Sequence, residues 1–285
     1  MVSRVWLITG ASSGFGRSLL SSVLARGDRV IATSRALEPI QSLEGSSDNL
    51  RLVQLDVTAG EELIRCRVAE AVAVWGRLDV LVNNAGSCHL GLLEEGGSAL
   101  LRKQYEVNVF GLMDVTSACL PYLRAQNEST VVMIGSRSAW TAETIGLGFY
   151  GSSKAAVHAL AETFAAELAQ FNIRVLLVQP SAFRTKMVRT AENFNTSNPI
   201  PVYDDTRRES MNFYAARDGN QAGDPDKAME AVVDVVRGEG GAQGKPWPGY
   251  LLLGKEADRD VRAKCRIMTE HLDEWSEVVN GVEFK

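Results

Sequence analysis

Short apolar runs alternate with amphipathic stretches along the first 180 residues of the chain. Each run holds about five apolar or β-branched residues. The runs cover 5–8, 29–33, 49–56, 78–83, 130–135 and 173–179. The stretches between them place apolar residues at helical spacing, as at Leu19 and Val23. Strands that are apolar on both faces and separated by helices indicate a parallel sheet covered by helices on both sides, with right-handed connections.

The pattern changes after residue 185. Residues 185–225 are polar and irregular, with aromatic residues scattered among Asn, Asp and Pro. A segment of this length without regular structure is usually functional or mobile, so we expect 186–223 to form a substrate-binding loop or lid. Asp224 and Pro225 then predict the N-cap and first position of a helix over 224–238.

A final strand over 250–253 and a charged helix over 255–279 end the chain. A length of 285 residues allows one large α/β domain or two small ones. Because the βα pattern is continuous and the last hundred residues return to the same sheet, we predict a single α/β domain over 1–285. Its core should be a doubly wound, mainly parallel seven-stranded sheet with helices on both faces.

Composition narrows the class of protein. A hydrophobic content of 45% excludes a disordered chain, and no apolar run approaches the ~20 residues of a membrane span. The four cysteines form no CxxC pair and the N-terminus has no secretory signal, so we expect buried, reduced thiols in the cytoplasm. A net charge of −5 argues against a nucleic-acid partner. His89, His158 and His271 lack metal-ligand spacing and are expected to be structural or exposed, with no metal bound.

A glycine-rich turn lies between the first predicted strand and the first predicted helix. Its sequence, TGASSGFG over 9–16, lets the chain turn sharply and brings backbone N–H groups against a pyrophosphate at the helix N-terminus. The residues expected to cradle the phosphates are Gly10, Ser12, Ser13, Gly14, Phe15 and Gly16. The alternative is an ordinary tight turn, but the strand before it and the helix after it are the context that dinucleotide binding requires.

The end of the second predicted strand indicates which dinucleotide binds. A site that prefers NAD places an acidic residue there to accept from the ribose 2′-OH. This chain has Ser34 and Arg35 instead, with no acid before Glu38. Since a hydroxyl and a guanidinium bind a 2′-phosphate, NADP(H) is the predicted cofactor, and Arg17 could contribute. The alternative is a solvated loop arginine in an NAD-preferring enzyme.

Five motifs occur in a fixed order between residues 9 and 185. They are TGxxxGxG over 9–16, Asn83-Asn84-Ala85-Gly86, Asn108, Ser136 and Tyr150-x-x-x-Lys154. In these the chain resembles the short-chain dehydrogenase/reductase family, in its short single-domain branch, which implies a Rossmann-type fold and oxidoreductase activity.

The resemblance also implies cofactor contacts outside the glycine-rich turn. Asp56, with Val57, matches the acid that contacts the adenine, and Asn83, Ala85 and Gly86 should run under the adenosine side. Pro180, Phe183 and Thr185 match the segment that covers the nicotinamide, with Thr185 at the carboxamide. Ser181 stands where the family usually has glycine, which tolerates every φ.

Tyr150 and Lys154 lie four residues apart on a predicted helix, so their side chains share a face. An ammonium beside a phenol favours the phenolate and should lower the pKa of Tyr150. The tyrosine would then donate or accept the proton of the reacting oxygen, and Lys154 would also hold the nicotinamide ribose and thereby bind the cofactor. Without the other motifs, a surface helix pair with a partly buried tyrosine would be the better interpretation.

Ser136 and Asn108 complete the predicted catalytic set. Ser136 ends an apolar strand, where ligands bind in open α/β sheets, and should orient the substrate oxygen. It lies fourteen residues before Tyr150, where the family usually has thirteen, so Ser138 is a competing candidate. Asn108 matches the family's asparagine, which implies that it holds a water linking Lys154 to solvent.

The substrate pocket is expected to be apolar and aromatic. Its candidate lining residues are Trp140, Phe149, Phe183, Met187, Phe194, Tyr203, Phe213 and Tyr214. Such a pocket suits a hydrophobic ketone or alcohol better than a sugar. The resemblance implies a homodimer or homotetramer that pairs through the helices carrying Asn108 and Tyr150.

The leading hypothesis is an NADP(H)-dependent carbonyl reductase or alcohol dehydrogenase. The alternatives are a non-catalytic NADP(H)-responsive binding protein on the same fold, an NAD-preferring dehydrogenase, and a lyase or isomerase that uses the same tyrosine.

Overall fold

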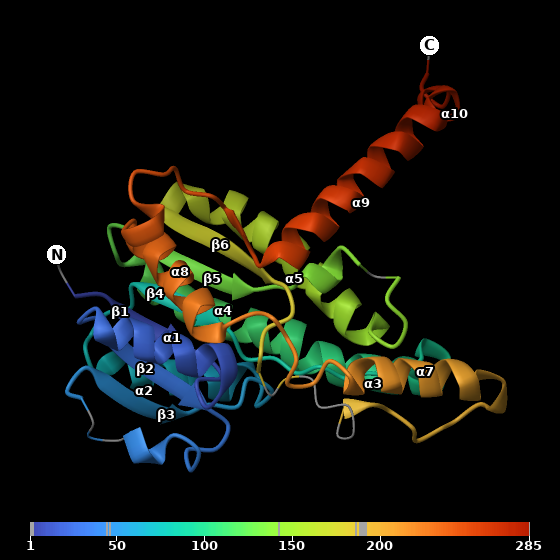
Figure 1. The fold of residues 1–285 in the computed structure, drawn as a ribbon. Helices are drawn as coiled ribbons and strands as arrows, with labels where there is room; N and C mark the ends of the chain where they lie inside the picture. Colours follow the sequence, from blue (N-terminus) through green and yellow to red (C-terminus); the bar gives the residue numbers. More distant parts are fainter. Residues whose placement is uncertain are drawn as a thin grey trace.

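Seven strands form one parallel sheet in the order β3-β2-β1-β4-β5-β6-β7 (Figure 1). The structure is a computed structural model that describes residues 3–43, 45, 47–141, 143–185, 187 and 193–284. The strands are β1 (Val5–Ile8), β2 (Arg29–Ser34), β3 (Leu50–Gln54), β4 (Val80–Asn83), β5 (Ser129–Ile134), β6 (Ile173–Pro180) and β7 (Tyr250–Leu253). The predicted sheet is confirmed, and the strand ends differ from the predicted ends by one or two residues.

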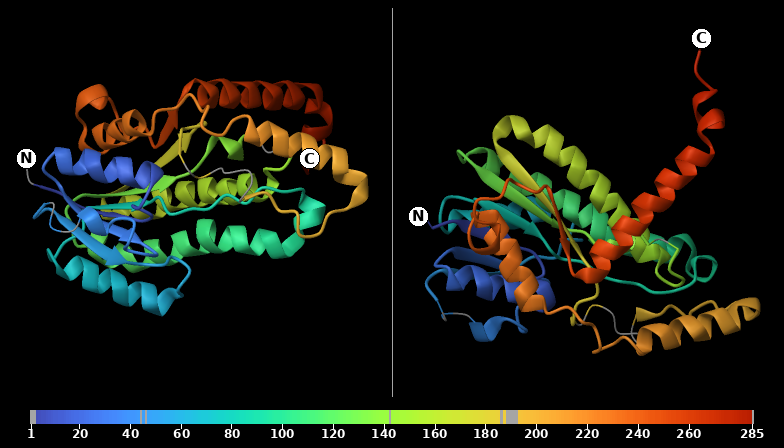
Figure 2. Two further views of the ribbon diagram at one scale, coloured as in Figure 1. Left: turned by 60° about the horizontal axis from the view of Figure 1, so that its bottom comes forward. Right: turned by 45° about the horizontal axis from the view of Figure 1, so that its top comes forward.

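Helices cover both faces of the sheet (Figure 2). One layer contains α1 (Gly14–Ala25) and α8 (Pro225–Arg237), and the other contains α2 (Glu61–Ala73), α4 (Gly111–Arg124) and α5 (Gly148–Leu168). In β1, Trp6 and Ile8 pack in the core with α1 and α8, whereas Val5 and Leu7 pack in the core with α2, α4 and α5. Because both faces of inner strands such as β1, β4 and β5 are buried, these strands are apolar at successive positions rather than at alternate ones.

The chain reverses its direction of travel across the sheet between β1 and β4. Strands β2 and β3 follow β1 on one side, and β5, β6 and β7 follow β4 on the other. In an open parallel sheet this arrangement leaves a crevice at the carboxyl ends of the two central strands, where ligands bind. The loops that carry the predicted motifs leave these strand ends, so the topology brings them together.

The segment after β6 is more regular than its composition suggested. It contains a turn of 3-10 helix (Pro201–Tyr203) and helix α7 (Asp204–Ala215), which lies beside α3 (Leu93–Tyr105). Glu95 of α3 is fully buried and accepts hydrogen bonds from the Arg207 guanidinium (2.7 Å) and from the Ile200 backbone N–H (2.9 Å). The prediction of an irregular segment is therefore wrong over α7, because a buried ion pair and the packing of Tyr214 and Met211 hold this helix. Residues 186 and 188–192 of the predicted lid lie outside the described residues.

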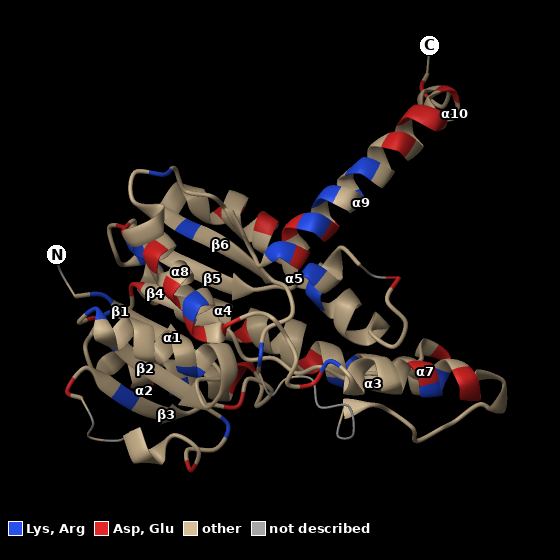
Figure 3. Cartoon of the chain, viewed as in Figure 1, with Lys and Arg blue, Asp and Glu red and all other residues tan. Residues whose placement is uncertain are grey.

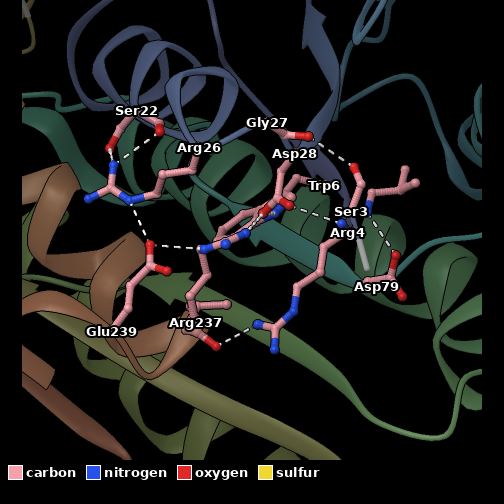
Figure 4. A network of polar contacts seen from close by, with 12 residues as sticks. Ser3, Arg4, Trp6, Ser22, Arg26, Gly27, Asp28, Asp79, Arg237 and Glu239 are labelled. Carbon is pink, nitrogen blue, oxygen red and sulfur yellow. Dashed lines mark hydrogen bonds and ion pairs between the residues drawn. The ribbon is translucent and has the colours of Figure 1, made fainter. Parts of the chain in front are cut away.

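A polar network lies at the amino ends of the strands, on the side of the sheet opposite their carboxyl ends (Figure 4). The buried Asp28 carboxylate accepts from the Trp6 indole N–H at 2.9 Å, the Arg4 backbone N–H at 3.0 Å and the Arg237 guanidinium at 2.7 Å. Arg26 of α1 pairs with Glu239 at 2.9 Å. These contacts fasten α8 and the turn after it to α1 and to the first two strands, and we call them the Asp28 clamp.

The last elements are α9 (Lys255–Glu274) and α10 (Ser276–Asn280), which project away from the sheet (Figure 1). They confirm the predicted final helix, apart from an interruption at Trp275. The predicted helix after Asp224 is confirmed as α8, whose first N–H groups donate to the Asp224 carboxylate. None of the helices described combines the length and the apolar character that crossing a membrane requires.

Candidate active site

A cleft of about 500 Å³ opens at the carboxyl ends of the central strands. It is lined by the loops that follow β1, β2, β3 and β4, and by Thr185 and Met187 from the segment after β6. The predicted cofactor residues that line it are Gly10, Ser12, Ser13, Gly14, Phe15, Ser34, Arg35, Asp56, Val57, Ala85, Gly86 and Thr185. The topology thus gathers residues that are spread over most of the chain.

The glycine cradle has its shape because two of its positions need left-handed backbone and a third has no space for a side chain. Gly10 and Gly14 have φ values of +66° and +52°. A Cβ on Gly16 would lie 2.3 Å from the Gly10 carbonyl oxygen and 2.7 Å from the Asn84 Nδ2 atom. This backbone therefore requires glycine at positions 10, 14 and 16, whichever ligand it binds.

Thr9 and Asn84 tie the cradle to the loop after β4. The Thr9 hydroxyl accepts from the backbone N–H groups of Asn84 (3.0 Å) and Ala85 (2.9 Å). The Asn84 amide donates back to the carbonyl oxygens of Thr9 (2.7 Å) and Gly10 (3.1 Å). Neither residue was singled out from the sequence, although both belong to its motifs, because the hydrogen bonds join positions about 75 residues apart.

Several predicted cofactor residues do not line the cleft. The Asn83 side chain is buried and donates to the Thr116 hydroxyl of α4 at 2.8 Å, so Asn84 replaces it at the cleft. Phe183 packs edge-on against Phe15, with ring centroids 5.2 Å apart. Pro180 is buried at the end of β6, Gly16 serves the packing of the cradle, and Arg17 is not among the lining residues.

Ser181 adopts an ordinary backbone. Among the described residues, Asn172 is the one non-glycine residue with positive φ. The Ser181 N–H donates to the Leu253 carbonyl at 2.9 Å, which extends the β6–β7 pairing. The usual glycine is therefore not needed at this position for conformational reasons.

Ser136, Tyr150 and Lys154 are not among the residues that line the cleft, but Tyr150 lies behind Met187, which does line it. Ser136 lies two residues after the end of β5, and its hydroxyl lies beside the Tyr150 phenol, where it lowers the pKa of the tyrosine. The Ser138 hydroxyl lies 3.1 Å from that of Ser136. The structure thus brings both candidate serines together, with Ser136 next to the tyrosine, and the role of Ser136 stays a prediction.

His158 holds the backbone of Ser136. Its Nε2 atom accepts from the Ser136 N–H at 3.3 Å, one turn along α5 from Lys154. Burial, together with the nearby charge of Lys154, lowers the pKa of His158 to about 4, so the ring is neutral at physiological pH and can accept this bond. His158 is structural, as expected, and it also positions Ser136, which is a residue of the candidate site.

The pKa of Tyr150 does not move in the expected direction. Burial raises the pKa of this phenol above its usual value, and the Ser136 hydroxyl offsets only part of the effect. Lys154 lies 5.8 Å from the centroid of the Tyr150 ring, and its ammonium donates to the Ile134 carbonyl at 2.6 Å. Burial also lowers the pKa of Lys154, to about 8. The predicted lowering of the tyrosine pKa is therefore wrong for this arrangement, because desolvation outweighs a charge held by another partner.

Asn108 lies in a π-helical turn (Glu106–Phe110) between α3 and α4. Its amide donates to the Ser87 carbonyl and to the Ser153 hydroxyl, both at 3.0 Å, and its Oδ1 atom accepts from the Ser87 N–H at 2.9 Å. The side chain therefore joins the loop after β4 to α5, and the water-holding role that the resemblance implies stays a prediction.

A small apolar cluster surrounds Tyr150. Its buried members are Cys88, Leu90, Tyr150, Phe194 and Tyr214, with Leu147, Met187 and Met211 packed against them. The Tyr150 hydroxyl lies 3.8 Å from the sulfur of Met187. Three predicted pocket residues, Met187, Phe194 and Tyr214, belong to this cluster. The other members, Cys88, Leu90, Leu147 and Met211, were not predicted, because single apolar residues outside a motif do not indicate a functional site.

The other predicted pocket residues lie elsewhere. Trp140 donates to the Gln179 side chain (2.7 Å), Tyr203 donates to Glu94 (2.8 Å), and Phe213 stacks on Arg217 in an exposed position. Phe149 is buried against Gly96.

His89, expected to be structural or exposed, lines the cleft, where burial and the charge of Lys103 lower its pKa. Within the described residues, no three His, Cys, Asp or Glu side chains gather where they could hold a metal ion.

Comparison with known proteins identifies the family. Residues 4–196 match the short chain dehydrogenase family. The chain is 33% identical to the uncharacterized oxidoreductase YusZ of Bacillus subtilis, over 83% of this chain and 85% of that protein. It is 35% identical to the 3-ketodihydrosphingosine reductase of Bacteroides thetaiotaomicron, over 83% of this chain and 84% of that protein.

A solved structure agrees over nearly the whole chain. The short-chain dehydrogenase of Streptomyces avermitilis superposes with a TM-score of 0.85 at 34% identity, covering 99% of this chain and all of that one. Members of the family use nicotinamide cofactors. The protein belongs to the short-chain dehydrogenase family of oxidoreductases.

Proposed function

We propose that the protein transfers a hydride between NADP(H) and a ketone or secondary alcohol on a hydrophobic small molecule. The observation that carries this proposal is the meeting of two features. A glycine cradle that opens onto a cleft lies next to a buried Tyr150 with Ser136 beside it and an apolar cluster around it.

The cleft residues fit an NADP(H) molecule. The cradle presents backbone N–H groups at the N-terminus of α1, where a pyrophosphate is stabilised by the helix dipole. At the end of β2, where a site that prefers NAD carries an acidic residue, Ser34 and the exposed Arg35 line the cleft instead. A hydroxyl and a guanidinium at this position favour a 2′-phosphate over a free 2′-OH. Asp56 lines the same end of the cleft, beside Val57, in a position suited to the adenine.

The chain's own residues can then handle the proton and the substrate oxygen. Bound NADP(H) supplies or accepts the hydride. Ser136 orients the substrate oxygen by a hydrogen bond, and Tyr150 transfers a proton to that oxygen during reduction or removes it during oxidation. A raised pKa keeps Tyr150 protonated through the neutral range, which is the form that a proton donor requires. Lys154 holds the ribose of the bound cofactor.

The apolar cluster supports a hydrophobic substrate. Cys88, Leu90 and Phe194 offer no ionised group, since burial raises the pKa of the Cys88 thiol to about 12. One of the relatives is named as a reductase of a ketone, 3-ketodihydrosphingosine, which supports a carbonyl on an apolar molecule. We include in the proposal a cytoplasmic location. Cys88 and Cys119 are buried as expected, but Cys66 and Cys265 are exposed, so the expectation of buried thiols is wrong for these two.

The test is the loss of NADPH absorbance with a panel of hydrophobic ketones, comparing the wild-type protein with Tyr150→Phe. We expect the variant to lose about 10²–10⁴-fold in kcat, because the general acid is removed while the ring stays in place. The affinity for NADPH, measured by fluorescence titration, should change little. Tyr122→Phe, a half-buried tyrosine of α4, is the matched control and should keep full activity.

A Tyr150→Phe variant with wild-type turnover would contradict the assignment of the proton donor. Tight NADPH binding by the wild-type protein with no turnover on any ketone or alcohol would instead point to a cofactor-responsive binding protein.

A further inference from the structure

The outer part of α9, together with α10, makes no packing contact that buries a side chain. Every residue from Cys265 to Phe284 is exposed. An isolated helix of this length is marginally stable in water, and most helices in proteins depend on packing of an apolar face. This segment therefore lacks the partner that its length requires.

The base of α9 is fastened to the body of the protein. Ala257 is fully buried, and Asp260 forms an ion pair with Arg137, the neighbour of Ser136. The direction of the helix is thus fixed at its root, so α9 presents its outer part as a preformed arm (Figure 1).

An apolar seam runs along the arm at alternating spacings of four and three residues. Its members are Val261, Cys265, Met268 and Leu272 on α9, Trp275 at the interruption between α9 and α10, and Val279 on α10. Leu272, Trp275 and Val279 are 52%, 49% and 48% exposed. This spacing repeats every seven residues and is the pattern of a helix that packs against a second helix in a coiled coil. Exposed apolar residues in a continuous line mark an interaction surface.

The charges on the arm indicate which partner fits. Residues 261–268 include Arg262, Lys264 and Arg266 and no acid, whereas 269–277 include Glu270, Asp273, Glu274 and Glu277 and no lysine or arginine (Figure 3). A second copy of the same helix running in the opposite direction would place the basic segment of each against the acidic segment of the other. A parallel copy would place like charges together, which costs free energy.

We infer that two copies of this chain pair through their α9 arms, antiparallel, along the Val261–Val279 seam. The register that buries the whole seam sets Val261 opposite Val279, Cys265 opposite Trp275 and Met268 opposite Leu272 of the partner copy. The basic segment of each copy then lies alongside the acidic segment of the other. The interface is distinct from the faces of α4 and α5, and it does not depend on the reaction proposed above.

Sedimentation velocity of the full chain tests the pairing. Leu272→Glu places a charge in the centre of the seam, and we expect the assembly to fall to roughly half its wild-type mass. Ile267→Glu makes the same chemical change at an exposed position off the seam and should leave the mass unchanged. A wild-type monomer at all concentrations, or an unchanged mass for Leu272→Glu, would overturn the inference. Circular dichroism of both variants checks that they fold.

Disulfide cross-linking tests the direction. In a Cys66→Ser background, Trp275→Cys should cross-link to Cys265 of the partner copy under a mild oxidant, giving dimers in most of the chains. Glu277→Cys, on the opposite side of the helix, should stay at background. Efficient dimers through Cys265 alone would show a parallel pair and overturn the antiparallel arrangement, as would equal yields from the two variants.

Discussion

Ser136 depends on a neutral histidine for its position. His158 accepts from the Ser136 N–H, and a protonated imidazole would have no free lone pair for this bond. The low pKa of His158 is thus coupled both to folding and to the geometry beside Tyr150.

The coupling predicts how stability changes with pH. The folded-state pKa of His158 is about 4, below its unfolded value of 6.5, so the unfolded chain binds more protons between these values. His158 therefore lowers the free energy of unfolding as the pH falls from 6.5 towards 4. Urea denaturation at several pH values should show a shallower decline for His158→Gln than for the wild-type protein. His271→Gln, an exposed histidine of α9, is the control and should follow the wild-type curve.

Arg35 carries the prediction of cofactor preference. Loss of a charge-assisted contact to a 2′-phosphate costs about 1.5–3 kcal/mol, which corresponds to roughly a 10- to 100-fold weaker affinity. Arg35→Ala should therefore bind NADPH more weakly by this factor while the affinity for NADH barely changes, as measured by fluorescence titration. Arg17→Ala, which changes an arginine outside the cleft lining, should alter neither affinity. Equal losses for the two cofactors in Arg35→Ala would rule out a role in 2′-phosphate binding.

The parts of the site that could be predicted from the sequence are those where backbone geometry or helical spacing determines the residue. Gly10, Gly14 and Gly16 are required by backbone geometry, and Tyr150 and Lys154 are placed by helical spacing. The environment of these groups was not predictable in the same way. The raised pKa of Tyr150 follows from burial under residues far apart in the sequence, and a spacing rule carries no information about desolvation.

Among the elements, α7 shows the limit of periodicity. Its sequence has acidic residues in the first turn and few apolar positions, so it resembles a polar loop. The helix is held by the pair of Arg207 with Glu95, which are 112 residues apart, and by Tyr214 and Met211, which pack in the cluster around Tyr150. A contact over that separation forms only when the fold brings α3 and α7 together, so no local sequence pattern predicts it.

The Asp28 clamp is expected to fasten α8 to the sheet. Asp28 and Arg237 are 1% and 10% exposed at their side chains, and removal of one partner leaves a buried charge without its counter-ion. Arg237→Met should lower the free energy of unfolding by about 3 kcal/mol, measured by chemical denaturation. The control is Arg208→Met, whose ion pair with Asp205 is exposed on both sides, and it should leave the midpoint unchanged. An equal effect of the two substitutions would show that the clamp contributes no more than a surface ion pair.

For the whole molecule, the sheet was the most predictable part. Runs such as 130–135 and 173–179 are apolar because both faces of β5 and β6 are covered, so the sequence pattern and the burial have the same cause. The direction of the α9 arm was not predictable, because the arm is fixed by a few contacts at its base, such as Asp260 with Arg137.

The Asp28 clamp and the cleft lie at opposite ends of the central strands. Even a four-residue strand such as β1 separates its two ends by roughly 13 Å, a distance over which the effects of substitutions usually add independently. Residues that secure the architecture and residues that contact ligands can therefore vary without constraining each other. A fold divided in this way can evolve new substrate preferences at one edge while the other edge preserves its stability.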